Sequence, residues 1–168
     1  MTAPAIVHRL HQIALAVSKR ESPAFEPSDF PGDRVVRLFQ SLHPHDQRHL
    51  LDVHCKAKKA GLDEVHCQAA LLHDVGKVTL AGTRISLWAR IAHVILHRIS
   101  PTAGATFARL GALGPGLRLA RDHGQIGADR LRALGVSESI CQIVECHDDS
   151  SQVSPQLCLL QKIDSETP

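Results

Sequence analysis

Apolar residues recur at intervals of three and four positions along most of the chain, and no window alternates apolar and polar residues for long. The first pattern is typical of amphipathic helices, whereas alternation would indicate half-buried strands. Prolines and glycines divide the helical pattern into segments. The sequence therefore predicts an all-α fold with helices over about 4–18, 33–42, 46–60, 63–74, 85–99, 117–134, 138–146 and 155–165.

Small polar residues and glycines mark the expected helix ends. Asp and Ser side chains cap helix N-termini, and glycine commonly takes the left-handed conformation just after a helix. The predicted N-caps are Asp33, Asp63 and Ser137, and the predicted terminating glycines are Gly61, Gly76 and Gly135.

The helical pattern is interrupted twice near the N-terminus. Residues 21–32 contain three prolines, and Pro44 follows the short segment that starts at Asp33. A length of 168 residues suits one domain with an appendage. We therefore expect a helical and linker extension over residues 1–44, packed on a core domain over residues 45–168.

Composition excludes several classes of partner and location. The formal net charge is only +2, and the large aromatics are one Trp and four Phe, so no nucleic-acid polymer is expected as a partner. The apolar window Ile85–Ile99 is too short and too charged to span a membrane, so no transmembrane segment is expected. Five cysteines without a C-x-x-C pair, together with the lack of a secretory N-terminus, favour a cytoplasmic protein with reduced thiols.

Histidine is unusually frequent, with 12 residues in the chain. One of them is followed by an aspartate in Ala-Leu-Leu-His73-Asp74-Val-Gly-Lys77, at the end of a predicted helix. Taken alone, two such polar residues are commonly capping or solvent-exposed groups. Further candidates lie on four other predicted helices, and helical bundles build metal sites by projecting one ligand from each helix into the core. The candidate metal ligands are His49, His73, Asp74, His123, His147 and Asp164.

The order H…HD…D, formed here by His49, His73-Asp74 and Asp164, resembles that of the HD-domain superfamily of metal-dependent phosphohydrolases. The resemblance covers about residues 45–166. His123 and His147 look like the two additional ligands of the binuclear branches. The resemblance implies an HD-type helical bundle carrying an N-terminal helical extension.

The resemblance also implies how the ligands divide between two metal ions. One ion would take His49, His73, Asp74 and Asp164, and the other would take Asp74, His123 and His147, so that Asp74 bridges them. His54 competes with His49 for the first position. His49 is preferred because the family's histidine stands four residues before a buried residue such as Val53. The mixture of imidazoles and carboxylates suits Fe, Mn, Zn or a similar divalent transition-metal ion.

The activity implied is hydrolysis of a phosphomonoester, phosphodiester or nucleotide by a metal-bound hydroxide, on a small and nucleotide-like phosphorylated substrate. Asp74 and Lys77 are the expected catalytic residues. Lys77 is also the first candidate for binding a phosphate, with Arg118 and Arg121 as weaker ones. Asp148 is expected to orient a ligand imidazole or a water molecule.

Two other functions remain open: an HD-type di-iron oxygenase, and a metal-binding signalling domain without turnover. One branch is disfavoured by a departure from its pattern. The cyclic-dinucleotide phosphodiesterases of that superfamily follow a His-His pair with Gly-Tyr-Pro. Here His147 is a single histidine, followed by Asp148, and the chain contains no tyrosine.

Overall fold

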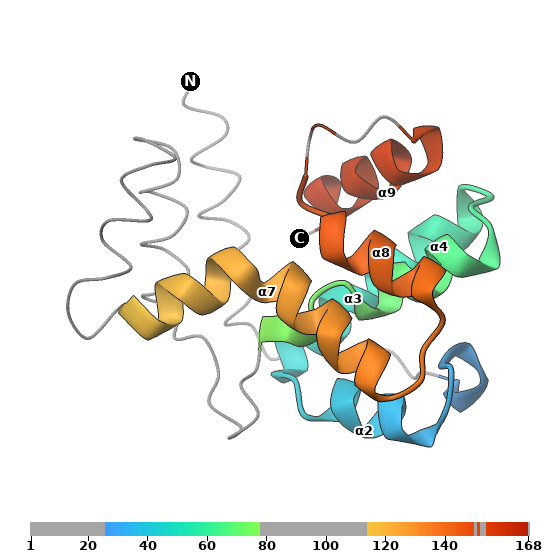
Figure 1. The fold of residues 1–168 in the computed structure, drawn as a ribbon. Coiled ribbons are helices and arrows are strands. Elements are labelled where there is room, and N and C mark those ends of the chain that lie inside the picture. Colours follow the sequence, from blue (N-terminus) through green and yellow to red (C-terminus); the bar gives the residue numbers. More distant parts are fainter. Residues whose placement is uncertain (1–25, 78–113, 150, 152–153, 168) are drawn as a thin grey trace.

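The computed structural model describes residues 26–77, 114–149, 151 and 154–167, and these residues form an all-α fold without strands (Figure 1). The predicted helices over 4–18 and 85–99 lie outside the described residues. The described elements are η1 (Pro27–Asp29), α2 (Asp33–Gln40), α3 (Pro44–Lys59), α4 (Glu64–Leu72), η2 (Val75–Lys77), α7 (Gly114–Ala133), α8 (Glu138–Cys146) and α9 (Pro155–Glu166). No helix among them is long and apolar enough to cross a bilayer.

Local sequence accounts for most of the helix ends. Asp63 is the N-cap of α4, and its side chain accepts a hydrogen bond from the His66 backbone N–H at 2.9 Å. Gly61 and Gly135 follow α3 and α7 with φ angles of +77° and +81°, which glycine adopts at little cost. Ser137 is the N-cap residue of α8, although its side chain makes no capping hydrogen bond.

Two helix starts differ from the prediction. The N-cap of α2 is Gly32, at φ +120°, and Asp33 is the first helical residue instead of the cap. There its carboxylate still lies in the first turn, where the helix dipole favours negative charge. Helix α3 begins at Pro44, two residues before the predicted start at Asp46, because a proline in the first turn needs no N–H partner.

The apolar faces of these helices form two adjoining cores. The larger core gathers residues from α2, α3, α4, α7 and α8, and its fully buried side chains include Val35, Phe39, Leu50, Leu72 and Val144. The smaller core joins α3 and α4 to α9 through Val53, Ala57, Leu62, Cys67, Ala70, Leu160 and Ile163. Helix α2 thus shares its core with the helices that follow it. Helix α9 has its own apolar contact with α3 and α4.

Three glycines let the backbone segments around the turn after α4 approach closely. A Cβ atom on Gly76 would lie 1.9 Å from the carbonyl oxygen of His123, so η2 rests directly on the backbone of α7. A Cβ on Gly124 would lie 2.8 Å from the carbonyl oxygen of Glu145 in α8, and Gly127 faces Gly76 from α7. Figure 1 shows α7 crossing beside η2 and α8. The glycines therefore set how closely α7 sits against both elements.

Candidate metal centre

The six residues predicted as metal ligands come together at one place, although they arise from distant parts of the chain. His49 lies on α3, His73 and Asp74 form the turn after α4, and His123 lies on α7. His147 is the C-cap of α8, and Asp164 lies on α9. Three overlapping groups each place one ligand atom per residue within 4.8 Å of one another: His49–His73–Asp164, His73–Asp74–His147 and His123–His147–Asp148.

The first group lies where α3, α4 and α9 meet. The Nε2 atom of His49 is 2.8 Å from Oδ1 of Asp164, and Nε2 of His73 is 3.3 Å from the same oxygen. The imidazoles of His49 and His73 are edge-on, with their centroids 5.6 Å apart. One carboxylate oxygen thus faces two imidazole nitrogens. This arrangement selects His49 as the histidine of α3 that belongs to the centre.

A second group, made of Asp74, His123 and His147 from the other two sets, lies between α7 and α8. The Nε2 atoms of His123 and His147 are 3.2 Å apart, and they lie 3.3 and 3.9 Å from Oδ1 of Asp74. Both histidines are buried, with side chains only 8% and 5% exposed. Two imidazole nitrogens and a carboxylate oxygen therefore converge away from bulk solvent, and these donor types suit divalent transition metals.

Asp74 stands between the two groups and turns one oxygen to each. Its Oδ1 faces His123 and His147, while its Oδ2 lies 3.7 Å from Nε2 of His73. The same Oδ2 forms an ion pair with the ammonium of Lys77. The carboxylate is 3% exposed, so its charge depends on these partners. Its orientation is the one that a bridging carboxylate needs.

Backbone carbonyls orient two of the histidines. Nδ1 of His73 donates to the carbonyl oxygen of Ala70 at 2.9 Å, and Nδ1 of His147 donates to that of Val144 at 2.7 Å. Each carbonyl belongs to the residue three positions earlier, at the end of the preceding helix. A carbonyl can only accept, so it fixes the proton on Nδ1 and turns Nε2 toward the centre. A helix end thus provides the tautomer that metal ligation needs.

The carboxylates and imidazoles shift each other's protonation. Burial raises the pKa of Asp74, but Lys77 and the imidazoles of His73 and His123 outweigh it and hold that pKa well below its usual range. Burial lowers the pKa of His73, but Asp74 and Asp164 outweigh it and raise that pKa to about 9. Without metal, His73 is therefore a cation at neutral pH, and its Nε2 proton occupies a place that a metal ion can take.

Burial and neighbouring charges also shift the pKa values of His147 and Asp164. Burial lowers the pKa of His147 to about 4, and the positive charge on His73 adds to this effect. His147 is therefore neutral at pH 7, with an Nε2 lone pair facing the centre. Burial opposes ionisation of Asp164, but His73 and His49 lower the pKa of its carboxyl below the usual range. Asp164 is therefore an anion.

Three of the described histidines that do not match the ligand pattern contact other protein groups. His54 is buried on α3, and its Nδ1 donates to the carbonyl oxygen of Cys67 at 2.7 Å. The Nδ1 of His43 accepts from the His45 backbone N–H at 3.2 Å, and His66 lies 2.7 Å from Asp63. His8, His11, His93 and His97 lie outside the described residues.

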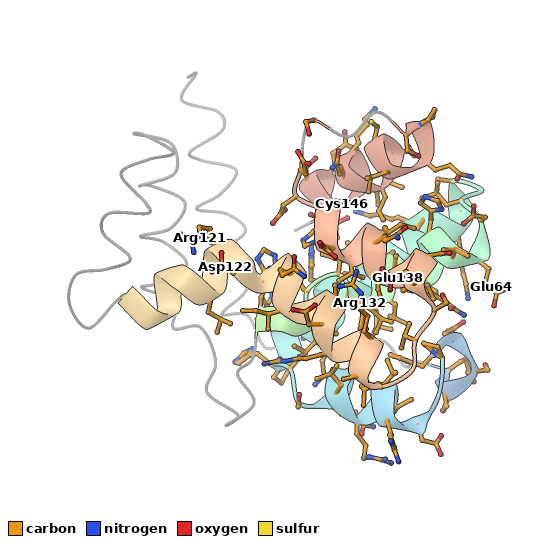
Figure 2. The ribbon with its side chains drawn as sticks, viewed as in Figure 1. Glu64, Arg121, Asp122, Arg132, Glu138 and Cys146 are labelled. Carbon is orange, nitrogen blue, oxygen red and sulfur yellow. The ribbon has the colours of Figure 1, made fainter. Side chains whose placement is uncertain are left out.

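Of the three cations predicted to bind substrate, Lys77 lies at the candidate centre and Arg121 lies on the surface of α7. Lys77 lies at the centre, paired with Asp74. Arg121 is exposed on α7, and Figure 2 shows it beside Asp122, with which it forms hydrogen bonds of 2.6 and 2.8 Å. The side chain of Arg118 lies outside the described part of α7. Cys146 directly precedes His147, and its S–H donates to the carbonyl oxygen of Gln142 at 2.8 Å.

The structure places the carboxylate of Asp148 beside the imidazoles of His123 and His147. Its Oδ2 lies 3.3 Å from Nε2 of His123 and 3.5 Å from Nε2 of His147. The predicted role was to orient a ligand imidazole or a water molecule, and orienting an imidazole requires contact with the nitrogen remote from the metal. For His147 that nitrogen, Nδ1, is already bonded to Val144. The adjacency of Asp148 to His147 was the available signal, but the direction of its side chain was not readable from spacing.

Lys77 supplies a cation to Asp74 and gives a test of this electrostatic arrangement. We expect Lys77→Met to lower the free energy of unfolding of the metal-free protein by about 1–3 kcal/mol, since a buried carboxylate loses one of its cationic partners. Saturating Mn²⁺ should recover most of the loss, because a divalent ion replaces the missing charge. Urea unfolding with EDTA and with Mn²⁺ measures both values.

A matched control is Lys58→Met, which removes an exposed lysine paired with Asp29 at 2.6 Å. An exposed pair contributes little, so this variant should lose little stability in either buffer. A Lys77→Met deficit that is equally large with and without Mn²⁺ would show that the ammonium does not occupy a metal-binding position.

The donor set fits divalent transition metals. Four imidazoles and three carboxylates converge, the buried carboxylate of Asp74 faces both groups, and two imidazoles are held with Nε2 inward. In the described residues these His/Asp clusters could hold a metal ion. The chain matches no protein-family model, and no curated protein or solved structure is significantly similar to it.

Proposed function

We propose that this protein is a cytoplasmic, HD-type metal-dependent phosphohydrolase that cleaves a small, nucleotide-like phosphoester at a binuclear His/Asp site. One observation carries the proposal: the buried carboxylate of Asp74 turns Oδ1 to His123 and His147 and Oδ2 to His73. His49 and Asp164 would complete the first metal position with His73 and Asp74. When bound, two divalent ions lower the pKa of water and offset the charge of a phosphoryl group.

The charges around the centre support an anionic substrate. The carboxylates of Asp74, Asp148 and Asp164 face the clustered imidazoles. Two divalent ions and the ammonium of Lys77 would bring five positive charges against these three carboxylates and a metal-bound hydroxide, leaving a positive centre. A phosphoryl group is attracted to such a centre. A neutral substrate of an oxygenase gains less from it.

The residues of the chain would divide the remaining work. His73 and His147, held by their backbone carbonyls, keep fixed directions while substrate binds and leaves. With a metal ion held by Asp74, the ammonium of Lys77 would be available to a phosphoryl oxygen. It is one-quarter exposed, so its ammonium can move between those positions. Arg118 and Arg121 remain weaker candidates for contacting the substrate.

The proposal is tested by purifying the protein without added metal and measuring its Fe, Mn and Zn content. The same preparation is assayed against nitrophenyl phosphates, nucleotides and dinucleoside polyphosphates. About two ions per chain with metal-dependent release of phosphate or nucleotide supports hydrolysis. A mixed-valent iron signal in electron paramagnetic resonance, with substrate-dependent O₂ uptake, indicates the oxygenase. Bound metal without turnover of either kind indicates a signalling domain.

Single-ligand variants test the division between the two positions. We expect His49→Ala to lose the first ion and retain the second, and His123→Ala to do the reverse, so that each variant holds about half the wild-type metal. Elemental analysis after dialysis against metal-free buffer measures this. His54→Ala is the control, since its imidazole bonds Cys67 instead, and it should retain the wild-type content. Loss of all metal in both ligand variants would contradict two separable positions.

A further inference from the structure

The two candidate metal positions differ in how open they are. In the first position the side chains of His49, His73 and Asp164 are 16%, 4% and 30% exposed. In the second, His123 and His147 are buried, but Asp148 is 66% exposed. The second position therefore reaches solvent along the carboxylate of Asp148.

Asp148 faces the nitrogens that would bind metal. Its Oδ2 lies 3.3 and 3.5 Å from the Nε2 atoms of His123 and His147, which are themselves 3.2 Å apart. The opposite nitrogen of His147 is occupied by the carbonyl of Val144. A carboxylate that merely orients a histidine contacts that opposite nitrogen. Asp148 therefore sits on the ligand side of both imidazoles.

We propose that Asp148 is a direct ligand of the second metal position, with Asp74, His123 and His147, and that its exposure makes this ion the exchangeable one. The inference rests on the proposed metal centre. Asp74 and the two histidines close the inner side of the position. An exposed carboxylate closes the outer side and can leave the metal without exposing buried groups, whereas the ion held by His49, His73 and Asp164 has no comparably exposed ligand. The second ion is accordingly the one that a phosphoryl group can reach by displacing a protein ligand.

The experiment uses Mn²⁺ alone as the probe, titrated into the metal-free full chain and followed by calorimetry and by the resonance signal of free Mn²⁺. The variant is Asp148→Asn, and the matched control is Asp149→Asn, which removes the same charge from the next residue. Asp149 accepts the Ser151 backbone N–H at 2.9 Å, and asparagine keeps that acceptor.

We expect the wild type to bind two ions and Asp148→Asn to weaken only one of the two steps, by at least about tenfold. Release of that ion to a chelator should be faster in the variant, and Asp149→Asn should match the wild type in both measurements. Equal affinities and exchange rates in all three proteins would overturn the role of Asp148 while leaving the metal centre intact. Loss of both steps in Asp148→Asn would overturn its assignment to one position. A wild type that binds fewer than two ions would refute the binuclear centre itself, and the inference with it.

Discussion

Gly76→Ala is expected to lower the free energy of unfolding by at least about 3 kcal/mol and to abolish metal binding. The added methyl would lie 1.9 Å from the carbonyl oxygen of His123 and 2.8 Å from the backbone nitrogen of Gly127. Both contacts are with backbone atoms, so no side-chain rotation relieves them. The turn carrying His73 and Asp74 must therefore move away from α7, which carries His123. Thermal unfolding should show a drop of roughly 6–12 °C.

The control for this variant is Gly61→Ala, at the end of α3. Gly61 has a positive φ of +77°, but nothing lies within 4 Å of the position that its Cβ would occupy. Its cost is the backbone strain alone, about 1–2 kcal/mol. Metal content should stay at the wild-type level because Gly61 is not part of the contact between η2 and α7. A Gly76→Ala protein with wild-type stability and metal content would show that this contact does not position the centre.

Asp74→Asn should remove both metal ions while leaving the helical fold intact. The amide has nearly the shape of the carboxylate, but it is neutral and offers only one oxygen to the two groups of histidines. Because each position would lose a shared ligand, we expect each affinity to fall by more than about 100-fold. Elemental analysis and Mn²⁺ titration measure this loss, and circular dichroism checks the helix content.

Asp164→Asn is the control that separates loss of one metal ion from loss of both. It replaces a carboxylate that faces His49 and His73 but neither His123 nor His147, so it should lose only the first ion. The difference between the two variants then measures bridging. If Asp74→Asn retained one tightly bound ion, Asp74 would serve a single position.

Local patterns in the sequence were sufficient to predict the helices of the described residues and to single out the candidate ligands on them. The cap at Asp63 and the glycines at 61 and 135 lie where helix-end chemistry puts them, and Asp33 was displaced by only one residue. Helical spacing also indicated one ligand on each helix, and the structure brings those six residues together. These features depend on a few neighbouring residues, which is why the sequence alone can show them.

What the sequence could not show depends on contacts between segments. Gly76 was predicted to end a helix, yet its main constraint is the backbone of α7. Asp148 follows the end of α8, where the chain has no regular period to direct its side chain. The Lys77–Asp74 pair joins residues three positions apart, whereas the contact of Asp148 with His123 arises only when α7 and α8 pack together.

Helix α9 contributes Asp164 to the candidate centre, so a bound metal ion would tie this helix to the rest of the fold. Helix α9 packs on α3 and α4 through the smaller core, to which it contributes Leu160 and Ile163. Asp164 directly follows Ile163 on the same helix. A metal ion bound by Asp164, His49 and His73 would cross-link α9 to the two helices on which it packs. Part of the metal-binding free energy would then be the free energy of docking α9, so that a bound ion would also hold the last described helix in place.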